Sequence, residues 1–291
     1  MRSLLFVPGD SERKLEKALA SGADVLILDL EDSVAPTAKR RARQISAEFL
    51  RSCAGKPSPA LYVRVNDLAS GLTDDDLTEV VSAAPAGIML PKADNADDVT
   101  LLSARLRVFE AENGFGDGAT MILPIITETP AGVLAAHTHA RSNPRLSGLT
   151  WGAEDLSAAI GARSPRDEEG CYTAVFQHAR TVTLLAAAAA GVAPVDTVFP
   201  EFRDETSFRR ECIAAERDGF TAKMAIHPAQ VPIINEVFTP SAEAVAHARS
   251  VITAFSEAGG AGVVAIGGKM YDRPHLKLAE RLLARASTKQ A

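Results

Sequence analysis

Ionisable side chains recur in one setting in this sequence, at the end of a short apolar run. Carboxylates end three of these runs, and a basic side chain ends two others. In chain order they are Asp29, Glu31, Asp32, Arg64, Lys92, Glu128, Glu154 and Asp155. Carboxylate oxygens suit a hard divalent cation, and Mg²⁺ takes only one or two of them while water and substrate fill its other positions. We therefore expect a Mg²⁺ site that handles a small oxoacid.

Glu128 and Asp155 are the expected Mg²⁺ ligands, and Arg64 offers a planar pair of donors to a substrate carboxylate. A 2-oxoacid chelates Mg²⁺ through its carboxylate and keto oxygens. The metal would then stabilise negative charge on the keto oxygen while a carbon–carbon bond is made or broken. Simpler explanations exist, because a polar residue after a strand often caps the next helix and a pair of acids can belong to a surface ion network.

Eight apolar runs alternate with longer segments of helical period, which is typical of βα units around a parallel sheet. The runs cover residues 4–7, 25–30, 61–66, 87–92, 121–128, 149–155, 197–200 and 223–227. Helices are expected between them, for example over 96–112 and 172–190. In a (β/α)₈ barrel the carboxyl ends of the strands converge on one face, where the active site is built. A TIM barrel, an α/β fold, would therefore bring the ionisable residues together.

The barrel is expected to occupy residues 1–228 as the catalytic domain. Residues 229–291 are expected to form a C-terminal helical extension that contributes to oligomer contacts and to a lid over the active site. This extension contains a helical segment over 241–258, a short apolar run over 263–266 and a last helix after Pro274.

Composition limits the classes of partner. The chain has 291 residues, enough for one barrel of roughly 250 residues and an extension. A net charge of −6 argues against a nucleic-acid partner. Three well-separated cysteines fit a reducing cytoplasm, and the apolar stretch 184–192 is too short to span a membrane. We expect a soluble cytoplasmic protein.

Several sequence blocks resemble one family. They are RSLLFVPGD at 2–10, LDLED at 28–32, LYVRVND at 61–67, LPK at 90–92, TETP at 127–130, WGAEDL at 151–156 and GKMYDRPH at 268–275. In this order they resemble the citrate lyase β-subunit-like family of the HpcH/HpaI aldolase superfamily, which includes malyl-CoA and citramalyl-CoA lyases. The resemblance implies a TIM barrel assembled as a homotrimer or a hexamer.

The resemblance also assigns roles. It makes Glu128 and Asp155 the metal ligands and Arg64 a catalytic, substrate-binding anchor. It implies that Asp29, Glu154 and Glu128 itself also face the substrate. Glu31, Asp32 and Lys92 support them, and the acids Asp29, Glu31 and Asp32 are placed to hold metal-bound water or neighbouring side chains.

Two further regions follow from the resemblance alone. Asp272 resembles an acid that lyases of this group deliver into a neighbouring subunit's site. The loop at Pro8 and Gly9, with Arg13 and Lys14 behind it, resembles part of a coenzyme A cradle.

The expected activity is Mg²⁺-dependent cleavage of a malyl-, citramalyl- or citryl-type 3-hydroxyacyl-CoA thioester into an acyl-CoA and a 2-oxoacid. Three alternatives stay open: the β subunit of a citrate lyase that works with an acyl carrier protein, a CoA thioesterase or malate-synthase-like enzyme, and a non-catalytic CoA-binding protein. The complete YDRP block at 271–274 favours stand-alone action on CoA.

Overall fold

The computed structural model describes residues 1–57, 59–141 and 143–287. The chain divides into two compact units, Met1–Asn235 and Glu236–Ala291. The domain boundary expected between residues 228 and 229 stays a prediction.

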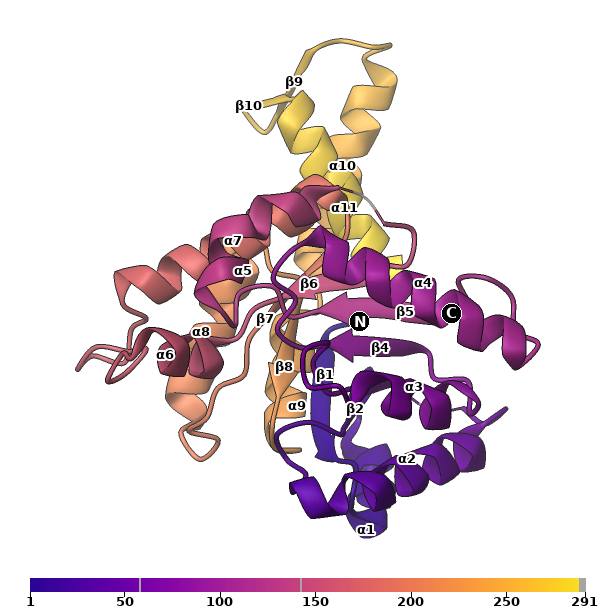
Figure 1. Cartoon of the computed structure of the whole chain (residues 1–291). Helices are drawn as coiled ribbons and strands as arrows, with labels where there is room; N and C mark the ends of the chain where they lie inside the picture. The colour runs from indigo at the N-terminus through magenta and orange to yellow at the C-terminus, as the bar shows by residue number, and fades with distance from the viewer. Residues whose placement is uncertain (58, 142, 288–291) are drawn as a thin grey trace. The chain divides into compact units, whose positions relative to one another are not determined.

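The first unit is built on parallel strands (Figure 1). Eight strands within the described ranges form one sheet in the order β5-β4-β3-β2-β1-β8-β7-β6. They are β1 Ser3–Pro8, β2 Val25–Asp29, β3 Ala60–Arg64, β4 Gly87–Leu90, β5 Met121–Pro124, β6 Gly148–Thr150, β7 Ala193–Asp196 and β8 Ala222–Ala225. Every strand pair in this sheet is parallel, as βα units require.

The sheet closes between β5 and β6. The parallel bridges Ile122–Leu146 and Ile125–Thr150 join the two edges, and the Ile126 amide donates to the Thr150 carbonyl at 3.0 Å. Closure confirms the predicted (β/α)₈ barrel. This seam is thinner than the other strand pairs, because each bridge has one partner outside the named strands.

Helices follow the strands and lie outside the sheet (Figure 1). They are α1 Glu12–Ala18, α2 Lys39–Cys53, α3 Thr73–Val81, α4 Ala96–Glu112, α5 Pro130–Ala135, α6 Ala153–Ile160, α7 Ala174–Ala190, α8 Glu205–Asp218 and α9 Gln230–Val237. Local sequence explains their ends: a capping box of Asn95 and Asp98 starts α4, and Gly191 in a left-handed conformation ends α7.

The barrel interior is apolar. Its core cluster is Leu4, Val25, Ile27, Tyr62, Met89, Leu123, Ile125, Val195, Ala222 and Met224, with Phe6 and Val198 packed against it. These side chains come from every second position of the strands, so their packing fixes which residues at the strand ends face the barrel mouth.

The seventh strand differs from the prediction of 197–200, which is wrong by four residues. The strand is Ala193–Asp196, whose Pro194 and Asp196 disfavour a strand when read from the sequence. Val198 and Phe199 follow the strand. They are apolar because Val198 packs against the barrel interior and Phe199 packs against Phe208.

Several predicted runs extend past the strand, and two of them do so by four residues or more. β5 ends at Pro124 and β6 ends at Thr150. Glu128 therefore lies on the loop before α5, and Glu154 and Asp155 lie in the first turn of α6. These carboxylates are carried by loops and a helix start rather than by the strands themselves.

The second unit contains α10 Ala242–Glu257, β9 Val263–Ile266, β10 Lys269–Asp272 and α11 Arg273–Ser287. β9 and β10 form an antiparallel hairpin whose turn, Gly267-Gly268, has φ of 55° and 79°, values that favour glycine. Ala248, Val251, Phe255 and Ala279 form its core. The extension thus holds a hairpin besides its helices. No helix in the described part of the chain is both long and apolar enough to cross a membrane.

Candidate active site

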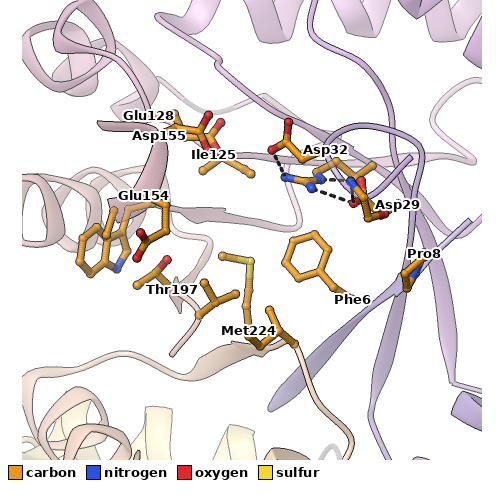
Figure 2. A pocket seen from close by; sticks show the side chains of 17 residues that line it. Phe6, Pro8, Asp29, Asp32, Ile125, Glu128, Glu154, Asp155, Thr197 and Met224 are labelled. Carbon is orange, nitrogen blue, oxygen red and sulfur yellow. Dashed lines mark hydrogen bonds and ion pairs between the residues drawn. The ribbon is translucent and has the colours of Figure 1, made fainter. Parts of the chain in front are cut away.

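A cavity of about 420 Å³ opens where the barrel strands end. Six of the eight ionisable residues singled out in the sequence line it: Asp29, Asp32, Arg64, Glu128, Glu154 and Asp155 (Figure 2). Glu31 and Lys92 contact members of this set from behind. The barrel therefore brings the eight residues into one neighbourhood, as the convergence of strand ends requires.

Arg64 is the last residue of β3 and is held by the acids that follow β2. Its Nε and Nη2 donate to the two carboxylate oxygens of Asp29 at 2.7 and 2.8 Å. Its Nη1 lies 2.9 Å from Glu31 Oε2 and 3.6 Å from Asp32 Oδ2. The two-donor edge expected to take a substrate carboxylate is thus engaged by Asp29, and a substrate would meet the remaining Nη hydrogens. The substrate-anchoring role of Arg64 stays a prediction.

Asp29 is fixed from two sides. Besides Arg64, its carboxylate accepts the backbone N–H groups of Glu31 at 2.9 Å and Ser33 at 3.1 Å. Burial raises the pKa of Asp29, but the hydrogen bond and charge of Arg64 outweigh burial and hold the pKa below its ordinary value. Asp29 is therefore ionised and acts on Arg64 in this structure.

Lys92 joins the two expected metal ligands. Its backbone N–H donates to Glu128 Oε2 at 2.6 Å, and its Nζ lies 3.3 Å from Asp155 Oδ1 and 2.5 Å from Glu31 Oε1. Its φ of 50° lies in the left-handed region, where a non-glycine residue costs about 1–3 kcal/mol. Such strain is kept where the surrounding contacts fix the conformation, and here they aim a backbone donor at Glu128.

Glu128 is almost completely buried, with 4% of its surface exposed. Burial is the main cause that raises the pKa of Glu128 to about 8, the charge of Asp155 raises it further, and the Lys92 backbone N–H opposes both. Burial likewise raises the pKa of Glu31 despite Arg64 and Lys92. A strongly perturbed acid in a cavity marks a candidate functional residue.

The cluster contains more acid than base. Among the described residues its members are the acids Asp29, Glu31, Asp32, Glu128 and Asp155 and the bases Arg64 and Lys92. Five carboxylates thus face two cations. The charge of Asp155 raises the pKa of Glu128, so these two acids repel each other and fit a divalent cation that needs one or two protein carboxylates.

Gly152 was not singled out in the sequence. A Cβ atom there would lie 2.6 Å from Glu128 Cγ and 3.0 Å from its Oε1. Its φ of −126° is ordinary, so the position needs a small residue rather than an unusual backbone. The Gly in WGAEDL thus lets Glu128 lie directly against the segment that carries Asp155.

A second charged cluster, also missed in the sequence, lies behind Trp151, which lines the cavity. Trp151 Nε1 donates to Asp196 at 2.8 Å, and Lys223 Nζ lies 2.8 Å from Asp196 and 2.9 Å from Glu211. Its other members are Arg166, Arg180 and Asp218. We call these six ionisable residues the balanced cluster, because their three carboxylates face three largely buried cations; the exposed Arg217 also contacts Asp218, at 3.2 Å. The sequence contains two signs of this cluster: Lys223 belongs to the apolar run 223–227, and Asp196 directly precedes the run 197–200.

The remaining predicted residues are placed as follows. Glu154 is exposed and Pro8 lines the cavity, whereas Gly9 packs tightly against the Asp29 carbonyl. Arg13 and Lys14 are exposed on α1. The roles given to them stay predictions.

Asp272 lies in the second unit, where its carboxylate contacts His275 Nδ1 at 2.5 Å. It is half-exposed at the end of β10. Its expected role as an acid stays a prediction.

A parallel barrel with an acid-rich cavity at its strand ends defines an α/β-barrel enzyme scaffold with a candidate cation site. Residues 2–228 match the HpcH/HpaI aldolase/citrate lyase family, and the chain belongs to this family. The resemblance to its citrate lyase β-subunit-like members is confirmed by the relatives that follow.

Two curated relatives cover nearly the whole chain. Citrate lyase subunit beta from Leuconostoc mesenteroides is 34% identical over 98% of this chain and 93% of the relative. A (3S)-malyl-CoA thioesterase from Cereibacter sphaeroides is 36% identical over 98% of this chain and 94% of the relative. One relative is named as a lyase subunit and the other as a thioesterase, so membership of the family does not by itself identify the reaction.

Solved structures agree with the fold. CitE from Mycobacterium tuberculosis, in complex with magnesium, acetoacetate and coenzyme A, is 35% identical with a TM-score of 0.77 and covers 98% of both chains. A citrate lyase from Burkholderia xenovorans has a TM-score of 0.84 at 23% identity over 99% of this chain and 92% of its own, which supports the fold alone.

Proposed function

We propose that this chain is a Mg²⁺-dependent carbon–carbon lyase that cleaves a 3-hydroxyacyl-CoA thioester into an acyl-CoA and a 2-oxoacid. The observation that carries the proposal is the burial of Glu128 beside Asp155: burial, and then the charge of Asp155, raises the pKa of Glu128 to about 8. The relative solved with magnesium, acetoacetate and coenzyme A supports the same ligand classes here.

Glu128 and Asp155 would hold the Mg²⁺ ion, which supplies positive charge for the substrate carboxylate and for the oxygen that becomes the keto oxygen. Arg64 contributes its free Nη hydrogens to the same anionic end, and Asp29 keeps its guanidinium oriented. Lys92 aims its backbone N–H at Glu128 and so fixes that carboxylate in the cavity.

Cleavage needs one proton to leave the substrate hydroxyl and another to reach the carbon of the departing thioester enolate. The acid-rich wall supplies carboxylates that can accept the first proton. Asp272 is the proposed donor of the second, in line with the family resemblance, and a homo-oligomer would bring it to a neighbouring subunit's cavity. Pro8, Gly9, Arg13 and Lys14 are proposed to contact coenzyme A.

Two relatives favour other outcomes. The 36% identical (3S)-malyl-CoA thioesterase favours hydrolysis of the thioester at the same site. The 34% identical citrate lyase subunit beta favours a subunit of a citrate lyase, for which the family resemblance implies action on an acyl carrier protein rather than on CoA. Both start from the same bound anion, so they differ in the fate of the thioester and in the carrier.

The test is to incubate the purified protein with malyl-CoA, citramalyl-CoA and citryl-CoA, with Mg²⁺ and with EDTA, and to follow oxoacid and free thiol. Mg²⁺-dependent release of oxoacid without free thiol is expected. Free thiol without oxoacid would replace the lyase by a thioesterase, and inactivity on all three would favour the carrier-dependent subunit.

A further inference from the structure

Three acids of one short segment converge on Arg64. The guanidinium contacts both oxygens of Asp29 at 2.7 and 2.8 Å, Glu31 Oε2 at 2.9 Å and Asp32 Oδ2 at 3.6 Å. In Figure 2 the dashed lines from Asp29 and Asp32 run to this guanidinium. Along a strand, residues 29 and 31 would face one side and residue 32 the other. The chain therefore has to turn directly after β2 for all three acids to reach one cation.

Lys39, the first residue of α2, holds this turn. Its Nζ donates to the backbone carbonyls of Leu30 and Glu31, both at 2.7 Å. Carbonyls of successive residues in a strand point in opposite directions, so two that share one donor belong to a turn. Leu30 and Glu31 are buried, and a buried backbone oxygen needs a hydrogen-bond partner. The ammonium group thus supplies one charged donor to two carbonyls of the turn.

Other contacts hold the beginning of the turn. The Leu30 N–H donates to the carbonyl of Arg64 at 2.9 Å, and Asn66 Nδ2 donates to the Leu30 carbonyl at 3.2 Å. Asn66 is itself fixed by the buried carboxylate of Asp76, which accepts its side-chain and backbone N–H groups at 2.7 and 2.8 Å. Neither contact with Leu30 reaches the Glu31 carbonyl, which the ammonium group also holds.

We propose that Lys39 is a positioning residue: it holds the turn at Leu30 and Glu31, so that the acids of this turn keep the guanidinium of Arg64 aimed at the anionic end of the substrate. The inference rests on the proposed function and deepens it. Without the ammonium group, Asp29 keeps its place at the end of β2, while Glu31 and Asp32 are free to move away from Nη1 of Arg64. The anchor for the substrate carboxylate then loses its orientation.

Hydrogen exchange of the full chain tests the turn directly. In Lys39→Met, which keeps a long unbranched side chain without a donor, the amides of Glu31 and Val34 should exchange at least tenfold faster than in the wild type. The amide of Ile27 in β2 should exchange at its wild-type rate. Lys39→Arg, whose guanidinium can donate to both carbonyls, should restore slow exchange. Unchanged exchange in Lys39→Met would overturn the inference.

Arg40→Met is the matched control, because it removes the same charge from the exposed neighbouring position on α2. It should leave the exchange of the turn unchanged. Acceleration equal to that in Lys39→Met would mean that the charge of the helix, rather than the two hydrogen bonds, holds the turn, and the inference would fail.

Ligand affinity tests the link to Arg64. Calorimetry with saturating Mg²⁺ uses pyruvate or glyoxylate, whichever the wild type binds more tightly. The affinity should fall about tenfold in Lys39→Met and less than threefold in Lys39→Arg. Mg²⁺ alone should bind with wild-type affinity, because Glu128 and Asp155 lie outside the turn. Equal weakening of Mg²⁺ and oxoacid binding would indicate general disruption and overturn the positioning role.

Steady-state kinetics separates this inference from the proposed function. In Lys39→Met the KM for the thioester should rise about tenfold while kcat stays within threefold, as expected when binding common to substrate and transition state is weakened. If thioesters are cleaved but this variant changes neither KM nor exchange, the lyase stands and the inference fails. If the wild type cleaves no thioester and binds no oxoacid, the proposed function fails, and hydrogen exchange alone decides whether Lys39 holds the turn.

Discussion

The molecule contains two groups of buried charge that differ in one respect. In the balanced cluster three carboxylates face three cations, and Asp196 and Lys223 are fully buried. In the acid-rich cluster at the cavity, which includes Glu31 and Lys92 behind the wall, five carboxylates face two cations. Burial alone would raise the pKa of Asp196, but Lys223 and Arg180 hold it below its ordinary value, whereas the pKa of Glu128 rises to about 8.

The difference separates a structural role from a chemical one. A buried ion pair that is complete keeps helices and strands in register, and its loss leaves a charge without a partner. A buried acid that lacks a partner destabilises the fold by itself, and such a position is kept where a ligand supplies the missing charge. The four predictions below test this division, from the largest expected effect to the smallest.

The largest effect is expected for Glu128→Gln. The amide oxygen can still accept the Lys92 N–H, so the loop keeps its shape while the charge is lost. Cleavage should fall by about 10³-fold or more, the scale of removing a group that stabilises the transition state, and the midpoint of urea unfolding should not decrease. An active variant, or one that unfolds much more easily, would place Glu128 among structural acids.

Asp196→Ala should have the opposite profile. It leaves Lys223, Arg180 and the Trp151 N–H without their shared acceptor. Breaking a buried ion pair costs about 3–5 kcal/mol of unfolding free energy. Urea denaturation measures this loss, with Asp32→Asn as a control at an exposed acid 3.6 Å from Arg64. A loss below about 1 kcal/mol would mean that the balanced cluster does not stabilise the barrel.

Gly152→Ala should affect the cavity with a smaller loss of stability. Its Cβ would meet Glu128 Cγ at 2.6 Å, and overpacking of this kind costs about 1–3 kcal/mol. Displacement of Glu128 should weaken Mg²⁺ binding by calorimetry about tenfold, since 1.4 kcal/mol corresponds to a factor of ten. Gly116→Ala, where an added Cβ meets nothing within 4 Å, is the matched control and should bind Mg²⁺ as the wild type does.

The smallest effect is a dependence on pH. Below a pKa of about 8, Mg²⁺ has to displace a proton from Glu128, so its affinity should rise by up to about tenfold per pH unit and level off above pH 8. Without metal, the raised pKa stabilises the fold below the unfolded value near 4.5, and this stability is lost as the pH rises through about 8. Calorimetry and thermal unfolding across this range measure both slopes. Both slopes should be shallower in Glu128→Gln, and unchanged slopes would assign the proton to another group.

Much of this division could be predicted from the sequence. Asp29 and Arg64 were expected at strand ends and are the last residues of β2 and β3. Parallel strands that alternate with helices fix which ends converge, so the barrel and its acid-rich face follow from local patterns.

The rest depends on contacts between distant segments. The sequence around Lys223 does not show that Asp196 and Glu211 neutralise its charge. The sequence around Gly152 does not show that Glu128 fills the space where a side chain of residue 152 would lie. The sequence could not predict that the backbone N–H of Lys92 points at Glu128, because a lysine gives no sign that its φ angle is positive. The position of β7 was predicted wrongly because Val198 and Phe199, which follow the strand, are apolar residues that pack against other parts of the barrel.

The thin seam of the barrel has a consequence for its dynamics. Glu128 follows β5 and Asp155 follows β6, so the two acids lie on opposite sides of the junction where the barrel closes. Local opening favours places with few backbone hydrogen bonds, and amides near Ile122 and Ile126 should exchange with solvent sooner than those of the β1–β2 pair. A metal ion bound by both acids would link the two sides of this junction, so that metal binding would also reduce local opening of the barrel.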